Sequence, residues 1–569
     1  MTSSLTQTTS ERVDDLPLIL HWLKQMEVAE QIDQQLKPAH QNRKGLSYGQ
    51  LSVLLLAYIV SQSDHRFNHV EGWVRVHRRT LEQASGWSIG DKDASDDRLA
   101  DLVSAIGSSA ELAVLEEAMA RQVVRAYALP TDIARCDSSS FSVYHQGEPE
   151  GSSESLIQYG YSKDHRPDLR QYRHALATID PAGVPLLSAT LAGNGDDDSM
   201  YYPFWNRLVS VIGHRHFVYI ADAKAASYQT RAQLNQAGGI YCFPLPMTGQ
   251  TPERLQQWVL SPPAQLQSIS LPQQSVEEPP VGWGFELSLC HLGAVLDPQR
   301  IDGWSERITR YRSEALAQRQ RQGLDQRVEK TQQALDKLSL KAAKDCCVLK
   351  NQVQTILKRY RTEDYFITQV QSQQVSQQVG RGRPSTKNPK PQKTIEQFCL
   401  RVQPHPEALE QARDLCGWRL YVTNATPEQF CLADAVIYYR EQWQLERGFH
   451  RFKRGHLPAL PMFLQDQQRI VGLMFLLSVA LRLLTVMEFV VQQQLQTLQQ
   501  SLDAIYAGNP KRKTERPSAE QLLFSFREIT LYFLKDGTTE ISPLTLLQQR
   551  ILALMRVPLS IYQLPDPVQ

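Results

Sequence analysis

The chain has 569 residues, 42% hydrophobic and 21% charged, which is typical of a folded protein with more than one domain. A formal net charge of +1 excludes binding to nucleic acid through overall positive charge, so any DNA surface must come from local clusters of cations. The eight cysteines form no CxxC pair and no zinc-binding spacing, and the polar residues 1–15 do not resemble a signal peptide. We therefore expect a cytoplasmic protein with reduced thiols.

The N-terminal part of the chain, residues 1–125, has the pattern of a helical domain. Apolar residues recur at helical spacing over residues 16–26, and residues 51–60 form one continuous apolar helix. Arginine and histidine side chains cluster between residues 65 and 79. We therefore predict that this domain binds DNA or mediates dimerisation, and that it reads base edges in the grooves.

From residue 126 onward the pattern is that of strands mixed with helices. Five apolar segments have the length of strands, at residues 132–143, 172–179, 184–191, 217–221 and 240–243. The turn Asp180-Pro181-Ala182-Gly183 predicts that the second and third form a hairpin, and residues 199–212 have the period of a helix. This order predicts an α/β fold with a mixed sheet, whose first part covers residues 126–245.

A long insertion is expected to divide this α/β core, at residues 246–415. Within it, residues 306–358 predict a polar helical hairpin, and residues 370–393 contain few hydrophobic residues and are expected to be mobile. The core resumes over residues 416–495, and residues 496–569 are expected to form a C-terminal helical region.

Two helices are predicted in the resumed core, at residues 433–455 and 470–491. The second is apolar and long enough to span a bilayer. Because Arg482 and Glu488 interrupt it, and charge at the centre of a membrane is costly, we interpret it as a buried core helix. We expect no membrane partner.

Two aspartates, Asp137 and Asp222, lie at or just beyond the ends of predicted strands. Neighbouring strand ends bring such side chains together, and with a third carboxylate from a helix they can hold two Mg²⁺ ions. Such ions activate water and stabilise the leaving oxygen of a phosphodiester. Taken alone, each aspartate is more typical of a loop or helix cap. A rival acidic run, residues 196–198, is expected to cap the next helix rather than bind metal.

The candidate for the third carboxylate is Glu446, in the helix predicted over residues 433–455. Tyr439, Gln442, Glu446 and Lys453 are separated by 3, 4 and 7 residues, which places them on one helix face. Further cations flank this face at Arg447, Arg451 and Arg454. The face can present Glu446 to metal and its cations to DNA phosphates, whereas the alternative is an amphipathic helix with ordinary charge pairs.

This helix resembles a known signature. Tyr439, Glu446 and Lys453 match the Tyr-x2-Arg-x3-Glu-x6-Lys pattern of insertion-sequence DDE transposases, in the insertion-sequence-four-like superfamily. The resemblance implies a ribonuclease-H-like core in which Asp137 and Asp222 are the first and second catalytic metal ligands. Glu446 is then the third.

One residue departs from the signature, because Gln442 stands where the family has arginine. The difference removes a cation that is a candidate DNA contact and leaves the metal ligand in place. Glu446 also follows Asp222 by 224 residues, which resembles a subgroup with a β-rich insertion before the last carboxylate. Segments 160–168 and 193–195 are similar to that subgroup as well.

Cations outside this helix are further candidates for DNA contacts. Lys163, His165 and Arg166 precede a core strand, and they either touch DNA near the active site or belong to a solvated loop. Arg381 and Arg383 lie in a four-residue match to the core of an AT-hook, whose arginines enter the minor groove. A flexible basic linker is the alternative for this segment.

The resemblance implies an enzyme that cuts DNA at insertion-sequence ends and joins the freed 3′-hydroxyl to target DNA. It implies two Mg²⁺ ions, with Mn²⁺ as a substitute, and a homodimer on DNA that carries transposon terminal repeats. The expected location is the cytoplasm, in association with the nucleoid. Two alternatives stay open: a related DDE nuclease that does not join ends, and a degenerate copy that only binds DNA. The departure at Gln442 is the feature that keeps the second alternative open.

Overall fold

The structure is a computed structural model. It describes residues 7–36, 44–145, 155–260, 266–272, 274–275, 277–291, 294–296, 299–301, 303–340, 343–379, 392–534 and 538–563. The chain forms two compact units. The first unit comprises Met1–Phe243, His291–Trp304 and Tyr438–Gln569, and the second comprises Pro244–Cys290 and Ser305–Ile437.

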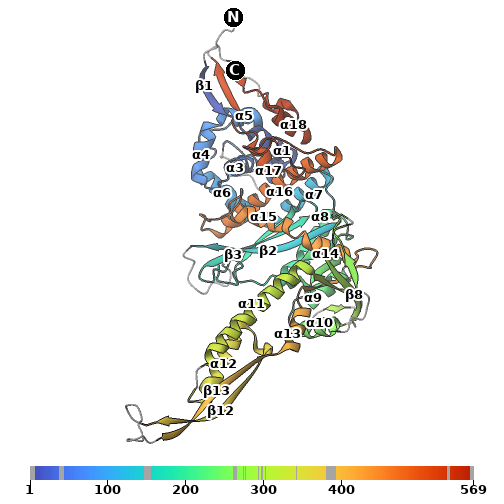
Figure 1. The fold of residues 1–569 in the computed structure, drawn as a ribbon. Helices are drawn as coiled ribbons and strands as arrows, with labels where there is room; N and C mark the ends of the chain where they lie inside the picture. Colours follow the sequence, from blue (N-terminus) through green and yellow to red (C-terminus); the bar gives the residue numbers. More distant parts are fainter. Residues whose placement is uncertain are drawn as a thin grey trace. The chain divides into compact units, whose positions relative to one another are not determined.

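Helices fill the N-terminal part of the first unit (Figure 1). They are α1 (Leu16–Gln25), α2 (Val28–Gln35), α3 (Tyr48–Gln62), α4 (Phe67–Val76), α5 (Arg78–Ser85), α6 (Asp96–Gly107) and α7 (Leu112–Ala126). Helix α3 begins with a capping box, in which the Ser47 side chain accepts a hydrogen bond from the Gln50 backbone N–H and the Gln50 side chain accepts one from the Ser47 backbone N–H. The predicted helical N-terminal region is confirmed.

The sheet strands of the first unit are β2 (Ile133–Val143), β3 (Arg170–Ile179), β4 (Val184–Ala192), β5 (Val218–Ala221) and β6 (Ile240–Pro244). Their order in space is β4-β3-β2-β5-β6. Strand β2 is antiparallel to β3 and parallel to β5, and β5 is parallel to β6. Nearly every residue of β3 is buried, including the polar side chains of Gln171, Arg173 and His174. The predicted mixed sheet is confirmed.

The later helices of the first unit are α8 (Tyr201–Ile212), α9 (Tyr228–Gln236), α15 (Trp443–Lys453), α16 (Gln467–Thr497), α17 (Ala519–Phe524) and α18 (Leu546–Leu554). The continuous helix predicted over residues 433–455 is wrong. Helix α14 (Leu432–Arg440) ends before α15 begins, and Glu441 and Gln442 form a turn between them. Both turn residues face the buried side chain of Arg135, a contact that helical periodicity does not report.

Helix α16 is long and apolar enough to cross a membrane by length and composition. Almost all of its apolar window is buried within the protein, as is usual for the central helix of a folded core. Arg482, buried on this helix, donates to the carbonyls of Pro185 and Leu186, each at 2.7 Å. The charge that interrupts the apolar run therefore joins α16 to β4.

The region beyond residue 496 is not wholly helical, which corrects the prediction. Strands β15 (Thr530–Leu534) and β16 (Thr539–Ile541) lie there, and β15 pairs with the N-terminal strand β1 (Gln7–Arg12). The sequence of β15 explains its strand form, since Thr-Leu-Tyr-Phe-Leu is rich in β-branched and aromatic residues. The two ends of the described chain thus share one small sheet.

In the second unit the strand order is β14-β11-β8-β7. The strands are β7 (Gln267–Ile269), β8 (Gly282–His291), β11 (Trp304–Ser313) and β14 (Trp418–Thr423). Helices α10 (Thr251–Leu260) and α13 (Pro406–Asp414) accompany them. A short pair, β9 (Ala294–Leu296) and β10 (Gln299–Ile301), lies between β8 and β11 in the chain but belongs to the first unit. Residues 306–313, predicted as helical, therefore belong to a strand.

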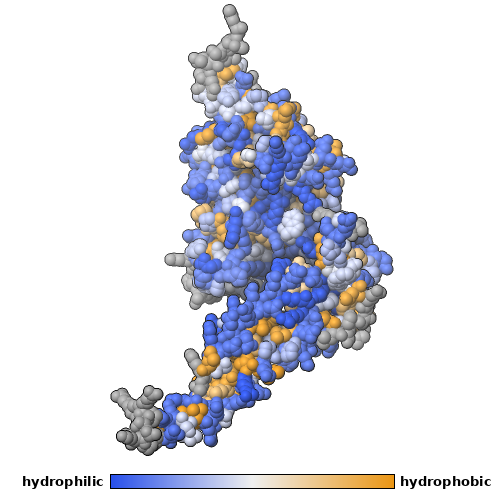
Figure 2. Space-filling model, in the orientation of Figure 1, coloured by the Kyte–Doolittle hydropathy of each residue, from blue (hydrophilic) through white to orange (hydrophobic). Residues whose placement is uncertain are grey.

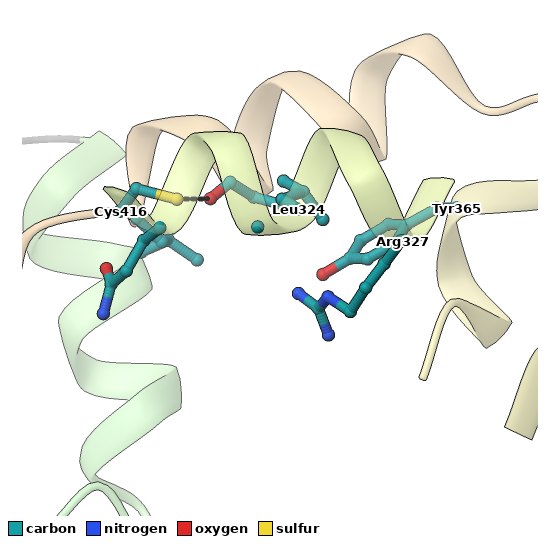
Figure 3. Close-up of a pocket in the computed structure, with 8 residues that line it drawn as sticks. Leu324, Arg327, Tyr365 and Cys416 are labelled. Carbon is teal, nitrogen blue, oxygen red and sulfur yellow. Dashed lines mark hydrogen bonds between the residues drawn. The ribbon is translucent and has the colours of Figure 1, made fainter. Parts of the chain in front are cut away.

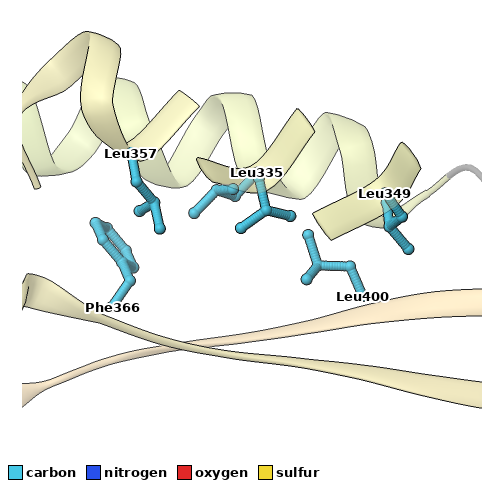
Figure 4. Close-up of a cluster of buried hydrophobic side chains, with 6 residues drawn as sticks. Leu335, Leu349, Leu357, Phe366 and Leu400 are labelled. Atoms are coloured by element: carbon cyan, nitrogen blue, oxygen red, sulfur yellow. The ribbon is translucent and has the colours of Figure 1, made fainter. Parts of the chain in front are cut away.

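A helical hairpin and a long β-hairpin complete the second unit. They are α11 (Glu314–Ser339), α12 (Cys346–Tyr360), β12 (Phe366–Gln378) and β13 (Gln392–Pro404). Side chains from both hairpins form one hydrophobic cluster (Figure 4), made of Leu335, Leu349, Val353, Leu357, Phe366 and Leu400. The segment 370–378, predicted as mobile, is an ordered part of β12, because its backbone pairs with β13 throughout.

A pocket of about 470 Å³ lies in the second unit between α11 and the end of α13. Arg327 and Tyr365 lie together at one end, and Cys416 donates to the Ala412 carbonyl at the other (Figure 3). None of the residues predicted to act on DNA lines this pocket. Hydrophilic side chains predominate on the face drawn in Figure 2, with a group of apolar ones over α11 and α12.

Candidate active site

The two predicted aspartates lie on adjacent strands of the first unit. Asp222 directly follows β5, whereas Asp137 is an interior residue of β2, which continues to Val143 and so corrects the expected strand end. The parallel register pairs Cys136 with Ala221, which places Asp137 and Asp222 at the same level of strands about 4.8 Å apart. The structure thus brings these two carboxylates together.

The two carboxylates also influence each other through their charges. Burial raises the pKa of Asp137 to about 6; the Lys163 ammonium opposes this rise, and the charge of Asp222 adds to it. Asp222 accepts a hydrogen bond from the backbone N–H of Lys224 at 3.0 Å. A further positive charge beside this pair is therefore favourable.

Lys163, predicted as a DNA contact, points at this carboxylate pair. Its Nζ lies 3.4 Å from Oδ1 of Asp137 and donates to the carbonyl of Ser138 at 2.6 Å. Its backbone N–H donates to the Ser140 hydroxyl at 2.9 Å, which fixes the segment against β2. The side chain is 28% exposed, so the ammonium can still meet a phosphate that enters the site.

Asp197 belongs to this site, although its sequence suggested a helix cap. It precedes the short 3-10 helix η1 (Asp198–Met200), but its side chain makes no capping hydrogen bond there. Instead Oδ1 accepts a hydrogen bond from the Ser138 hydroxyl at 2.7 Å. Two signals in the sequence pointed to this part of the chain: the acidic run 196–198 and the resemblance of segment 193–195 to the transposase subgroup.

Three cations surround the buried Asp197 carboxylate. Arg173 forms an ion pair with it, and the ammonium groups of Lys163 and Lys224 lie 3.6 and 3.4 Å from its Oδ2. Burial opposes ionisation, yet the Ser138 hydroxyl and these three cations together lower the pKa of Asp197. Asp197 therefore remains ionised and holds two lysines beside Asp137 and Asp222.

Tyr201, at the start of α8, is a second residue that sequence reasoning missed. Its hydroxyl donates to Oδ1 of Asp222 at 2.5 Å, and its backbone carbonyl accepts a hydrogen bond from Tyr219 at 3.1 Å. Burial and the charge of Asp222 raise the pKa of Tyr201, which keeps the hydroxyl protonated as a donor. No feature of the sequence around Tyr201 marks it.

Glu446 lies on the exposed side of α15. Within the described residues it makes no hydrogen bond or ion pair, and no three acidic, histidine or cysteine side chains there already form a metal-holding group. The structure therefore joins Asp137 and Asp222 directly and leaves Glu446 as a free carboxylate on the neighbouring helix.

Two contacts on this same side of α15 connect it to β2 and the loop before β3. The Gln442 amide oxygen lies 3.4 Å from Nη1 of Arg135, which donates to it. At the other end of α15, Lys453 donates to Asp164 at 2.7 Å and lies 5.2 Å from the ring centroid of Phe141. Lys453, a predicted DNA contact, is thus only 18% exposed.

The arginines that flank this side of α15 are held by carboxylates. Arg447 donates to Glu488 at 2.6 and 3.0 Å, and Arg451 donates to Glu488 at 2.6 Å and to Glu520 at 2.7 Å. Only 3% of Arg451 is exposed. The prediction that Arg451 contacts DNA therefore needs correction, because its guanidinium is buried between α16 and α17; Arg447 remains partly exposed.

His165 and Arg166 lie on the surface next to Lys163. His165 is exposed and has a left-handed backbone conformation with φ of 57°. Arg166 forms a two-pronged ion pair with Asp168 at 2.7 and 2.8 Å and donates to the Tyr144 hydroxyl. Both remain accessible, and their role in DNA binding stays a prediction.

The other predicted DNA contacts are less well defined by the structure. Tyr439 is half-buried near the end of α14, so it does not continue the face of α15 that carries Glu446. Arg381 and Arg383 lie outside the described residues.

The family of the protein follows from a comparison with known domain families. The transposase DDE domain family matches residues 130–483, which contain β2, β5, α15 and most of α16. The match covers more than half of the chain, and the protein belongs to this family. Its fold is a ribonuclease-H-like mixed α/β fold preceded by a helical region, and its partner is DNA. None of the curated proteins matches the chain.

Proposed function

We propose that this transposase cleaves DNA strands at the ends of an insertion sequence and transfers the freed 3′-hydroxyl groups to target DNA. Asp137, Asp222 and Glu446 are the carboxylates of the proposed active site. The observation that carries the proposal is the course of α15 along β2, which supports a position of the third carboxylate near the first two.

Helix α15 and strand β2 run in the same chain direction. Near the start of α15, Gln442 contacts Arg135, and at its end Lys453 contacts Phe141. The contacting residues are eleven apart on the helix and six apart on the strand, which corresponds to about 17 Å and about 20 Å. The helix and the strand therefore advance by nearly the same distance between these two contacts.

This pairing predicts the neighbour of Glu446. Glu446 lies about 6 Å beyond Gln442 along the helix, and Asp137 lies about 7 Å beyond Arg135 along the strand. Gln442 and Glu446 share a helix face because they are four residues apart, and Arg135 and Asp137 share a sheet face because they are two apart. We therefore infer that Glu446 lies alongside Asp137.

The packing of Gly448 also indicates that α15 lies over the sheet at the level of Asp137. A Cβ atom on Gly448 would lie 3.6 Å from Cδ1 of Leu176. Leu176 is the cross-strand partner of Asp137 on β3, so the two side chains are on the same face of the sheet. Helix α15 thus crosses the sheet at the level of Asp137, two residues after Glu446.

The donor atoms fit hard divalent cations. Three carboxylates provide only oxygen ligands, which Mg²⁺ prefers and Mn²⁺ accepts, and the paired aspartates favour an added positive charge. Two such ions, when bound, lower the barrier to attack by water or a hydroxyl and stabilise the leaving oxygen. Asp137, Asp222 and Glu446 would hold them.

The other residues of the site orient these ligands and the DNA. Tyr201 fixes one oxygen of Asp222 by its hydrogen bond. Lys163 and Lys224, both held by Asp197, offer cations to the phosphates next to the scissile bond. The two ends of an element must be held together for joining, so we propose that the protein acts as a homodimer on DNA, in the cytoplasm.

Substitution of the three carboxylates tests this function. Asp137→Asn, Asp222→Asn and Glu446→Gln should each abolish Mg²⁺-dependent cleavage and strand transfer on DNA that carries the element's terminal repeats. DNA binding, measured by gel shift without metal, should persist because each change keeps the side-chain shape. Asp132→Asn, at an exposed aspartate just before β2, is the matched control and should remain active.

Near-normal cleavage by any one of the three variants would show that its residue is not a ligand. A wild-type protein that cuts but never joins ends would be a nuclease. One that binds terminal repeats but does not cut with Mg²⁺ or Mn²⁺ would be a degenerate copy.

A further inference from the structure

Gln442, which departs from the transposase signature, contacts a buried cation in this protein. Arg135 is fully buried in β2, two residues before Asp137. Its guanidinium donates to Asp180 at 2.7 and 2.8 Å and to the Gln442 amide oxygen at 3.4 Å. A carboxylate oxygen of Glu441 lies 3.8 Å away.

The charge of Arg135 explains why glutamine suits position 442. A glutamine provides a neutral acceptor to the outer edge of the guanidinium. An arginine there would place a second guanidinium beside the first, in a region where Arg135 has no exposed surface. An arginine cannot accept the hydrogen bond from Arg135, and two guanidinium groups in close contact at a buried site repel each other even with Asp180 alongside, so arginine would push the start of α15 away from β2.

The β3–β4 turn provides a second packing contact for the start of α15. Gly183 in this turn has φ of 63°, and a Cβ atom on it would lie 3.1 Å from the carbonyl oxygen of Gln444. The same turn carries Asp180, the main partner of Arg135. The break between α14 and α15 therefore rests on both the turn and Arg135.

We propose that Gln442 is a positioning residue that, together with Arg135 and Asp180, sets the register of α15 along β2. It holds Glu446 level with Asp137 by accepting a hydrogen bond from Arg135. This inference rests on the proposed function. It means that the glutamine that replaces the signature arginine has a positioning role of its own, through its contact with Arg135. It predicts that restoring the signature arginine damages the enzyme.

The test compares Gln442→Arg with Gln442→Glu, which keeps an acceptor for Arg135. His450→Arg is the matched control, since it adds a cation to an exposed position of the same helix. Single-turnover cleavage at saturating DNA, the Kd for DNA and the melting temperature without DNA are measured for each variant.

We expect Gln442→Arg to slow single-turnover cleavage by about 10- to 100-fold, as a small displacement of a catalytic group does, without weakening DNA binding. Gln442→Glu and His450→Arg should stay close to the wild-type rate. A Gln442→Arg protein that cleaves as fast as wild type would overturn the inference. So would weaker DNA binding by Gln442→Glu with tighter binding and unimpaired cleavage by Gln442→Arg, which is the pattern of a direct DNA contact.

A wild-type protein without metal-dependent cleavage overturns the proposed function instead, and the melting temperatures then decide the contact. A lower melting temperature for Gln442→Arg than for Gln442→Glu supports the pairing with Arg135. Equal melting temperatures refute it.

Discussion

At the scale of single residues, three adjacent aspartates show how strongly surroundings decide a role. Asp196 and Asp198 are exposed. Asp197 is buried, accepts a hydrogen bond from Ser138 and forms ion pairs with Arg173 and two lysines. Burial of an ionised carboxylate is tolerated only because these partners compensate for the lost water. This carboxylate in turn is one of the partners that hold the two lysines beside the proposed active site.

Asp197→Asn should therefore destabilise the first unit and weaken DNA binding near the active site. Removal of one member of a buried ionic group leaves the others uncompensated, and we expect a loss of about 3–5 kcal/mol in the free energy of unfolding. Urea denaturation measures this loss, and Asp196→Asn is the exposed neighbour that should change little. An Asp197→Asn protein as stable as the Asp196→Asn control would contradict the role of the buried carboxylate.

At the scale of elements, α15 is joined to α16 and α17 by a group of four charged side chains. Arg447 and Arg451 from α15 meet Glu488 from α16 and Glu520 from α17. Glu488 also accepts from the backbone N–H of Ala519 at 2.8 Å. The helix that carries Glu446 is thus held on one side by Arg135 and on the other by these carboxylates.

The stability of this helix group should depend on acid pH. Burial opposes ionisation of Glu520, but hydrogen bonds from Arg451 and its charge lower the pKa to about 2, from an ordinary value of 4.5. A lowered pKa adds stability that is present above about pH 4.5 and is lost as the pH falls toward 2. We expect Glu520→Gln to lower the free energy of unfolding at neutral pH by an amount on the order of 1–3 kcal/mol.

The difference between wild type and Glu520→Gln should then shrink between pH 4.5 and 2. Urea unfolding at a series of pH values measures it, with Glu515→Gln, at an exposed glutamate before α17, as the control without a change. A difference that stays constant over this pH range would show that Glu520 does not depend on Arg451.

At the scale of the whole molecule, the N-terminal helices are built into the first unit. A methyl group on Gly107 of α6 would overlap the carbonyl of Gln468, and one on Gly472 of α16 would overlap the carbonyl of Val103. Helices α6 and α16 therefore pack with their backbones in contact. The boundary expected near residue 125 does not separate compact units, and a deletion of residues 1–125 would expose the central helix of the core.

Gly472→Ala should consequently lower the stability of the first unit. The added methyl group must force the two helices apart, for which we expect about 1–3 kcal/mol from overpacking. Gly72→Ala in α4 is the matched control, since nothing lies within 4 Å of the added Cβ and alanine favours the helix. Thermal unfolding of both variants decides the matter, and a Gly472→Ala protein as stable as wild type would exclude the close packing.

The sequence by itself predicted the strands of the core and the helical N-terminal region, and it marked Asp137, Asp222 and Glu446 as candidate metal ligands. These features depend on local periodicity and on a motif within one helix, so neighbouring residues suffice to predict them. The pairing of Asp137 with Asp222 needed only the order of the strands.

Only the tertiary structure decided the roles of Asp197, Tyr201, Arg451 and Gln442. Each depends on a partner that is distant in the chain: Asp197 lies 59 residues from Ser138, and Gln442 lies 307 residues from Arg135. Periodicity predicts which face of a helix is buried, but it does not predict which charged residue of another element contacts that face. In our proposal, the break before α15 and the glutamine in place of arginine both follow from the buried guanidinium of Arg135 and the β3–β4 turn beside it.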